Sequence, residues 1–273
     1  MIDFIQQLIS YPFIQRALIV GILVSLCAAL LGVTLVLKRY SMIGDGLSHV
    51  GFGALAIATV FNIAPLSLAI PVVVIAAFLL LRISESSKIK GDAMIALIST
   101  SALAIGVTAV SVTTGMNTDI YNYMFGSILS MSESDVKLSI VLSIVVITMY
   151  ILFYNKIFSI TFDEPFSKAT GTKTRGYNAL VAILTAITVV LGMRMMGALL
   201  ISSLIIFPAL TAMRTVKSFK GVVVCATIVS LVCFIAGICM SYFFGTPAGA
   251  SVVIINLGLF LIFSFIGFIR EHI

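Results

Sequence analysis

Asp45 and His49 place a carboxylate and an imidazole four residues apart in an apolar segment that continues to about Phe61. In a helix, residues i and i+4 lie one above the other on the same face, so both side chains could reach one small cation. A carboxylate with an imidazole suits zinc, manganese or ferrous iron better than calcium or magnesium, which prefer oxygen ligands. The pair is therefore a candidate metal site. A structural Asp–His hydrogen bond between helices is the alternative interpretation.

The expected depth of this pair in a membrane strengthens the functional interpretation. Lys38–Arg39 marks a polar edge, and ten residues of unbroken helix at about 1.5 Å each would carry His49 roughly 15 Å inward. That depth is close to the middle of a hydrocarbon core about 30 Å thick. Ionisable groups placed there are costly and are functional candidates by default. A break at Gly44 would change this estimate, because Asp45 would then cap the helix that follows.

The composition is that of a membrane protein. Of the 273 residues, 61% are hydrophobic and only 10% are charged. Several apolar runs approach or exceed the roughly 18 residues that signal a membrane span. We expect an all-α polytopic bundle of eight or nine spans in a single domain, residues 1–273. The expected spans are about 14–37, the Asp45/His49 segment to 61, and about 66–81, 93–114, 136–154, 179–192, 195–213, 221–244 and 248–268.

Threading these spans alternately separates the basic residues. Arg16, Lys137 and Arg194 fall on one side, which leaves 13 of the 16 lysines and arginines on the other. The positive-inside rule makes the second side cytoplasmic, so we expect a cytoplasmic carboxyl terminus and an external amino terminus. The formal charge of +6 then reflects basic loops and not nucleic-acid binding. Residues 1–15 have no positive n-region, so we expect the first span to be retained.

Further polar residues within or beside the apolar segments could line a path for the ion. The candidates are Ser48, Asp119, Asn122, Ser202 and Ser203. The two adjacent serines share a span with Pro208, which frees a backbone carbonyl one turn earlier. A kinked packing helix is the alternative interpretation of that span. Asp119 and Asn122 belong to a less hydrophobic stretch, residues 115–135, which could re-enter the membrane.

The longest polar stretch, residues 155–178, contains the signals of a short helix. Asp163 can act as the N-cap, Pro165 lies in the first turn, and Gly171 suits the C-terminal stop. A short cytoplasmic helix has a purpose when it docks a partner; an ordered, solvated loop is the alternative.

The sequence lacks several catalytic and nucleotide-binding motifs. It contains no P-loop, no His-Glu-x-x-His, no nucleophile elbow and no paired cysteine clusters. We therefore expect neither an enzyme nor a tightly bound cofactor. A proton-coupled secondary carrier with Asp45 as proton acceptor, or a structural membrane protein, is an alternative interpretation of the same residues.

Four stretches, in the same order, resemble the signatures of ABC-type zinc/manganese permeases. They are KRYSMIGDGLSHVGFGALAI, DIYNYMFGSIL, MMGALLISSLIIFPALTA and FFGTPAGASVVI. The resemblance implies a homodimeric type II ABC importer permease in the cytoplasmic membrane of a prokaryote, with the fold of metal-chelate and cobalamin-type importers. It also implies a separate cytoplasmic ATPase and an extracytoplasmic metal-binding protein. Zinc is the cargo we expect, with manganese and iron as alternatives because their permeases share these motifs.

The resemblance also assigns residue roles. Asp45 and His49 match the acidic residue and the histidine implicated in metal passage. Residues 164–171 are similar to the coupling helix that inserts into the ATPase, although Pro165 and Phe166 replace two alanines of the common pattern. The expected coupling residues are Asp163, Glu164, Phe166, Ala169 and Gly171.

Overall fold

The computed structural model describes residues 12–86, 91–113, 124, 126 and 132–272. These ranges form helices and connecting turns and contain no β-strand. The helices are α2 (Pro12–Leu37), α3 (Ser41–Val60), α4 (Pro65–Ser86), α5 (Gly91–Thr113), α7 (Glu133–Leu152), α8 (Tyr154–Phe162), α9 (Glu164–Ala169), α10 (Thr174–Met196), α11 (Ala198–Thr215), α12 (Phe219–Phe244) and α13 (Ala248–His272).

Nine of the described helices are long and apolar enough to cross a membrane. They coincide with the nine expected spans, and only α8 and α9 are too short. The predicted all-α polytopic bundle is therefore confirmed. Residues 115–123, 125 and 127–131 lie outside the described residues, and with them the predicted re-entrant segment.

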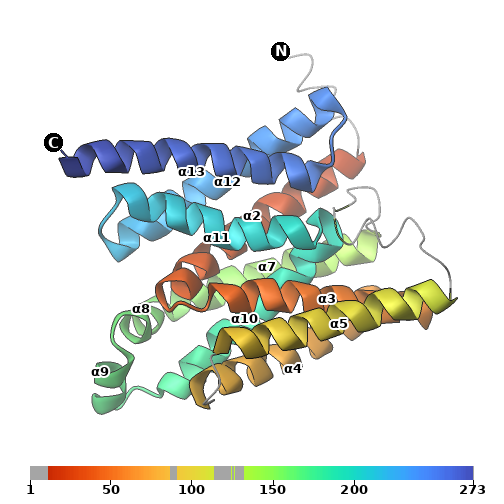
Figure 1. Ribbon diagram of the computed structural model, residues 1–273, viewed down its shortest axis with the longest axis horizontal. Coiled ribbons are helices and arrows are strands. Elements are labelled where there is room, and N and C mark those ends of the chain that lie inside the picture. Colours follow the sequence, from red (N-terminus) through yellow and green to blue (C-terminus); the bar gives the residue numbers. More distant parts are fainter. Residues whose placement is uncertain (1–11, 87–90, 114–123, 125, 127–131, 273) are drawn as a thin grey trace.

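The helix that carries Asp45 and His49, α3, lies between two groups of helices. On one side it packs against α4 and α5, and on the other against α10 and α11. Figure 1 shows α12 and α13 along one flank of the bundle, α4 and α5 along the other, and α8 and α9 at one end. One cluster of buried apolar residues runs through most of these helices.

Glycines allow the closest helix contacts. A Cβ atom added to Gly53 of α3 would lie 2.5 Å from the carbonyl oxygen of Ala102 in α5, and one added to Gly32 of α2 would lie 2.1 Å from that of Ile205 in α11. Side chains at these positions would force the backbones apart. The many small residues near Asp45 thus have a packing role.

A tight turn separates α2 from α3. The N–H of Tyr40 donates to the carbonyl of Leu35 at 2.7 Å, and that of Arg39 donates to Val36 at 3.1 Å. These two bonds form a Schellman motif, with Arg39 at the left-handed position, φ 60°. The interruption between the two helices therefore lies at residues 38–40. Because α3 continues through Gly44, Asp45 is inside the helix and is not its N-cap.

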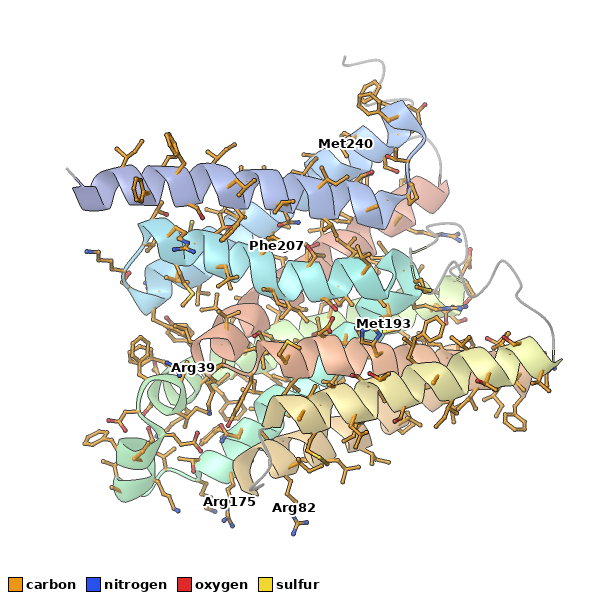
Figure 2. The ribbon with its side chains drawn as sticks, in the orientation of Figure 1. Arg39, Arg82, Arg175, Met193, Phe207 and Met240 are labelled. Carbon is orange, nitrogen blue, oxygen red and sulfur yellow. The ribbon has the colours of Figure 1, made fainter. Side chains whose placement is uncertain are left out.

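The basic residues divide between the two ends of the bundle. Figure 2 shows Arg39, Arg82 and Arg175 toward the end that holds α8 and α9. This distribution agrees with the expected alternation of the spans.

At the opposite end, the first turn of α7 supplies two carboxylates to basic residues. Glu133 forms an ion pair with Arg16 of α2. Asp135 lies 3.5 Å from Arg194 of α10. Two of the three basic residues expected outside are therefore paired with acidic ones.

Candidate metal site

Asp45 and His49 lie one turn apart on the same face of α3. The distance between Nε2 of His49 and Oδ2 of Asp45 is 3.7 Å, which is too long for a hydrogen bond. Their side chains are 37% and 38% exposed, respectively. Within the described part of the chain, no hydrogen bond joins either side chain to another helix, so the structural alternative of an Asp–His bond between helices finds no support. Both groups keep lone pairs available for a ligand.

The two side chains line a pocket of about 300 Å³ between α3, α5 and α11. The lining residues are Asp45, Ser48, His49, Phe52, Leu103, Met124, Ala198, Leu199 and Ser202. A water molecule in the liquid occupies about 30 Å³, so this space accommodates a metal ion together with several waters. The other lining side chains are apolar except that of Ser202, so the polar side chains of the pocket lie mostly on α3.

Two predicted path residues meet at this pocket. The hydroxyls of Ser48 in α3 and Ser202 in α11 lie 3.2 Å apart. Each hydroxyl also lies within hydrogen-bond distance of a carbonyl in its own helix, that of Asp45 at 2.7 Å for Ser48 and that of Ala198 at 3.2 Å for Ser202. The serine pair therefore joins α3 to α11.

The remaining predicted path residues are placed differently. Ser203 is buried, and it is not among the residues that line this pocket. Its hydroxyl has no hydrogen-bond partner among the described residues. Asp119 and Asn122 lie outside the described residues. The role of these three residues in a path stays a prediction.

The described residues supply two candidate metal ligands, Asp45 and His49. Among the described residues, no group of three or more histidine, cysteine, aspartate or glutamate side chains is placed to hold a metal. Structural zinc sites use four protein ligands. Two ligands, with water completing the shell, favour an ion that binds and leaves over one held permanently.

The sequence interpretation missed several lining residues, of which only one had a local signal. Phe52 follows Asp45 by seven residues and Ser48 by four, so helical spacing places it on the same face. Leu103, from α5, and Leu199, from α11, reach the pocket only because of how the helices pack. Hydropathy alone does not give that packing.

The short helix predicted within residues 155–178 is present as α9. The side chain of Asp163 accepts a hydrogen bond from the N–H of Phe166 at 2.8 Å, and Pro165 lies in the first turn. Gly171 has φ +84° and ends the helix in a second Schellman motif, with Thr172 donating to Ser167. The sequence signals for this helix were therefore correct.

The predicted coupling residues fall on two faces of α9. Four of them are exposed, namely Asp163, Phe166, Ala169 and Gly171. Phe166 presents a large apolar side chain, 63% exposed, to the surroundings. The carboxylate of Glu164 differs, because it contacts Lys38 and Asn178 of its own chain.

Comparison with known proteins identifies close relatives over nearly the whole chain. Residues 10–267 match the model of the ABC 3 transport family. The chain is 30% identical to the manganese import system permease protein ScaB of Streptococcus gordonii, covering 97% of this chain and 95% of the relative. It is 31% identical to the high-affinity zinc uptake system membrane protein ZnuB of Haemophilus influenzae, covering 92% and 97%. The solved structure of PsaBC from Streptococcus pneumoniae, in complex with Fab, is similar with a TM-score of 0.86 at 29% identity, covering 96% of this chain and 95% of that one.

Proposed function

The chain belongs to the ABC 3 transport family and is the permease of an ABC metal importer rather than an enzyme, and from this premise we propose that its cargo is zinc. The observation that supports a divalent transition metal as cargo is the pairing of Asp45 with His49 on one wall of a pocket of about 300 Å³, and the similarity to ZnuB favours zinc. A carboxylate and a neutral imidazole are both regular zinc ligands. Because neither is hydrogen-bonded to another helix in the described part of the chain, both can turn toward an ion.

We propose that the ion passes between two copies of this chain. Each copy contributes one carboxylate and one imidazole, so two copies facing each other would supply four ligands. The exposed side of Asp45 and His49 is the side that a second copy would cover. Conduction requires binding that is favourable enough for entry but weak enough for release, and ligands shared between two moving subunits meet that need.

The same proposal assigns partners to the two ends of the bundle. A separate ATPase would contact the exposed face of α9, where Phe166 stands out from the surface. An extracytoplasmic metal-binding protein would deliver the ion at the opposite end. The carboxyl terminus would then be cytoplasmic, in agreement with the basic residues gathered near α8 and α9.

Manganese is the second candidate cargo. It is favoured by the similarity to ScaB, whose printed name is that of a manganese import permease. Carboxylate ligands suit manganese, and imidazole is acceptable to it as well as to zinc. Zinc and manganese differ in preferred coordination number, so the donor pair alone does not choose between them. Iron is included as a competitor in the experiment for the same reason.

The test is ATP-dependent ion uptake into proteoliposomes that contain this chain and its ATPase, with the binding protein supplied outside. Zinc, manganese and ferrous iron compete in one assay. We expect His49→Ala and Asp45→Ala to abolish uptake while membrane levels stay normal. His272→Ala is the matched control, because residue 272 is the only other histidine of the sequence.

Three outcomes would contradict parts of the proposal. Uptake that persists in both alanine variants would exclude the Asp45/His49 path. Preferred uptake of manganese or iron would replace zinc as the cargo while leaving the path intact. Uptake driven by a proton gradient without ATP would point to a secondary carrier.

A further inference from the structure

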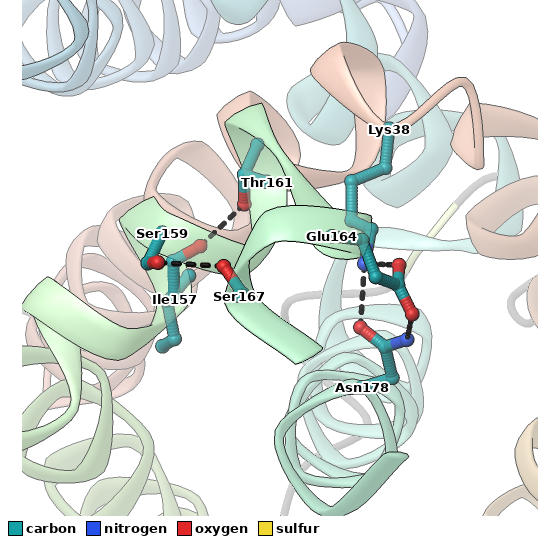
Figure 3. Close-up of polar contacts among 7 residues, drawn as sticks. All are labelled: Lys38, Ile157, Ser159, Thr161, Glu164, Ser167 and Asn178. Atoms are coloured by element: carbon teal, nitrogen blue, oxygen red, sulfur yellow. Dashed lines mark hydrogen bonds and ion pairs between the residues drawn. The ribbon is translucent and has the colours of Figure 1, made fainter. Parts of the chain in front are cut away.

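Three side chains form a closed polar ring at the α9 end of the bundle, which we call the Lys38 ring. Nζ of Lys38 lies 2.9 Å from Oε2 of Glu164. The side-chain amide of Asn178 donates to the other carboxylate oxygen of Glu164 at 2.8 Å and accepts a hydrogen bond from Lys38. Figure 3 shows these three contacts closing on one another.

Two side chains of the ring are buried and the third is partly exposed. The side chain of Lys38 is only 8% exposed, and that of Glu164 is 34% exposed. Asn178 is 4% exposed. A lysine this deeply placed needs a charged partner, because an unpaired ammonium group would lose its hydration without compensation. The carboxylate of Glu164 supplies that charge, so the position of α9 is tied to that of Lys38.

The three residues come from three different elements. Lys38 is in the turn between α2 and α3, Glu164 is the first residue of α9, and Asn178 is in the second turn of α10. A hydroxyl contact of 2.6 Å between Ser159 and Ser167 joins α9 to α8 (Figure 3). Glu164 therefore links the short helix to the turn that begins the metal-site helix.

The turn that contains Lys38 can transmit a movement of that residue to the start of α3. Its Schellman bonds fix residues 38–40 relative to the end of α2, and Ile43 of α3 donates to the carbonyl of Tyr40 at 2.9 Å. The ammonium group of Lys38 also lies 5.6 Å from the centre of the Tyr40 ring. Asp45 follows the start of α3 by four residues, about 6 Å along the helix axis.

We propose that the Lys38 ring couples movement of α9 to the position of α3, so that Lys38, Glu164 and Asn178 are positioning residues for the metal site. This inference rests on the proposed function, in which the ATPase moves α9. The exposed face of α9 receives the movement, and the carboxylate on its inner face passes it to Lys38. The start of α3 then shifts, and with it the carboxylate and imidazole that face the ion.

The experiment measures ions imported per ATP hydrolysed by the reconstituted complex, with zinc and manganese ions as probes. Lys38→Met keeps the length of the side chain but removes the ammonium group. We expect this variant to retain ATP hydrolysis and to import about tenfold fewer ions per ATP, within the range of typical coupling between distant sites. Lys156→Met, on the exposed side of α8, is the matched control and should leave the ratio unchanged.

A second variant separates coupling from folding. Lys38→Met combined with Glu164→Gln removes both charges, so no unpaired charge remains buried and the fold should tolerate the change. We expect the double variant to keep a low import ratio. If the double variant regains both thermal stability and the wild-type number of ions imported per ATP, the ring is purely structural and the inference is overturned. A normal ratio in Lys38→Met would overturn it as well.

The same assay distinguishes failure of this inference from failure of the proposed function. If the wild-type complex shows no ATP-dependent import, the proposed function fails. If the wild type imports, His49→Ala does not, and Lys38→Met imports with the normal ratio, only the coupling role is wrong.

Discussion

The candidate metal site and the Lys38 ring differ in how closely their charged side chains are paired and how far they are exposed. At the metal site, Asp45 and His49 are 3.7 Å apart, and more than a third of each side chain is exposed. In the ring, Lys38 and Glu164 are 2.9 Å apart, and the lysine is almost fully buried. Both pairs lie near the same helix, one within α3 and one at the turn before it.

The proposed roles of the two pairs account for this difference. A site that passes an ion needs lone pairs that the protein itself does not use, so incomplete hydrogen bonding is an advantage there. A contact that transmits movement needs its polar atoms satisfied by one another, because a fully paired network is rigid. The comparison predicts that substitutions at the metal site affect transport, whereas substitutions in the ring also affect stability.

The largest expected effect on transport comes from isosteric changes at the metal site. In Asp45→Asn and His49→Gln, ion import should fall at least about 100-fold, because loss of outer-shell partners alone costs about 10–100-fold at metal sites. The free energy of unfolding in mixed micelles should change by less than about 0.5 kcal/mol, as for other substitutions outside a network. If both variants lost stability together with import, the pair would stabilise the fold and not bind the ion.

The ring should respond asymmetrically to removal of its two charges. Glu164→Gln leaves the buried ammonium group of Lys38 without its carboxylate, and we expect a loss of about 3 kcal/mol in the free energy of unfolding. Lys38→Met leaves a carboxylate that is partly exposed and can hydrate, and should cost about 1 kcal/mol. Both free energies are measured by equilibrium unfolding in mixed micelles. Equal losses in the two variants would show that the burial of Lys38 does not determine the cost.

Changing the helix packing beside the candidate metal site tests whether the close approach of α3 and α5 at Gly53 stabilises the fold. Gly53→Ala places a methyl group 2.5 Å from the carbonyl oxygen of Ala102. We expect a loss of about 2 kcal/mol in the free energy of unfolding, typical of overpacking, because α3 must move away from α5. Gly176→Ala is the control, since a Cβ atom there meets nothing within 4 Å. A similar loss in both variants would show that the effect is not steric.

The smallest effect is expected in the turn between the two regions. Arg39→Gly should raise the free energy of unfolding by about 1 kcal/mol, because glycine adopts the left-handed conformation without the Cβ penalty. Arg39→Ala keeps that penalty and should give no gain. Thermal unfolding in detergent compares the two variants. An equal gain in both would assign the effect to the arginine side chain and not to the backbone.

The sequence predicted the elements of this fold well because membrane spans have a strong one-dimensional signal. A helix long and apolar enough to cross a membrane lies at each of the nine expected spans, since a long continuous apolar run satisfies its backbone in a bilayer as a helix. The start and end of α9 were also predictable, because capping by Asp163 and the left-handed Gly171 depend on neighbouring residues. Helical spacing placed Asp45 and His49 on one face for the same local reason.

Contacts between elements could not be predicted in the same way. Glu164 was expected among the coupling residues, which stays a prediction, but no local signal indicated that its carboxylate contacts Lys38, 126 residues away in the chain. Ser202 and Ser203 are adjacent and chemically identical, but only Ser202 lines the pocket. Which side of a helix faces which neighbour depends on side-chain shape across the bundle. Hydropathy and motif spacing do not predict that shape.

The ion pair between Arg16 and Glu133 has a consequence for how the chain is made. The two residues are 117 positions apart. At about 5–20 residues per second, Glu133 leaves the ribosome roughly 6–23 seconds after Arg16. In the proposed orientation, Arg16 must therefore cross the membrane while its partner has not yet been synthesised. By the positive-inside rule, the two basic residues Lys38 and Arg39 at the other end of the first span would outweigh the single charge of Arg16 until Glu133 is made.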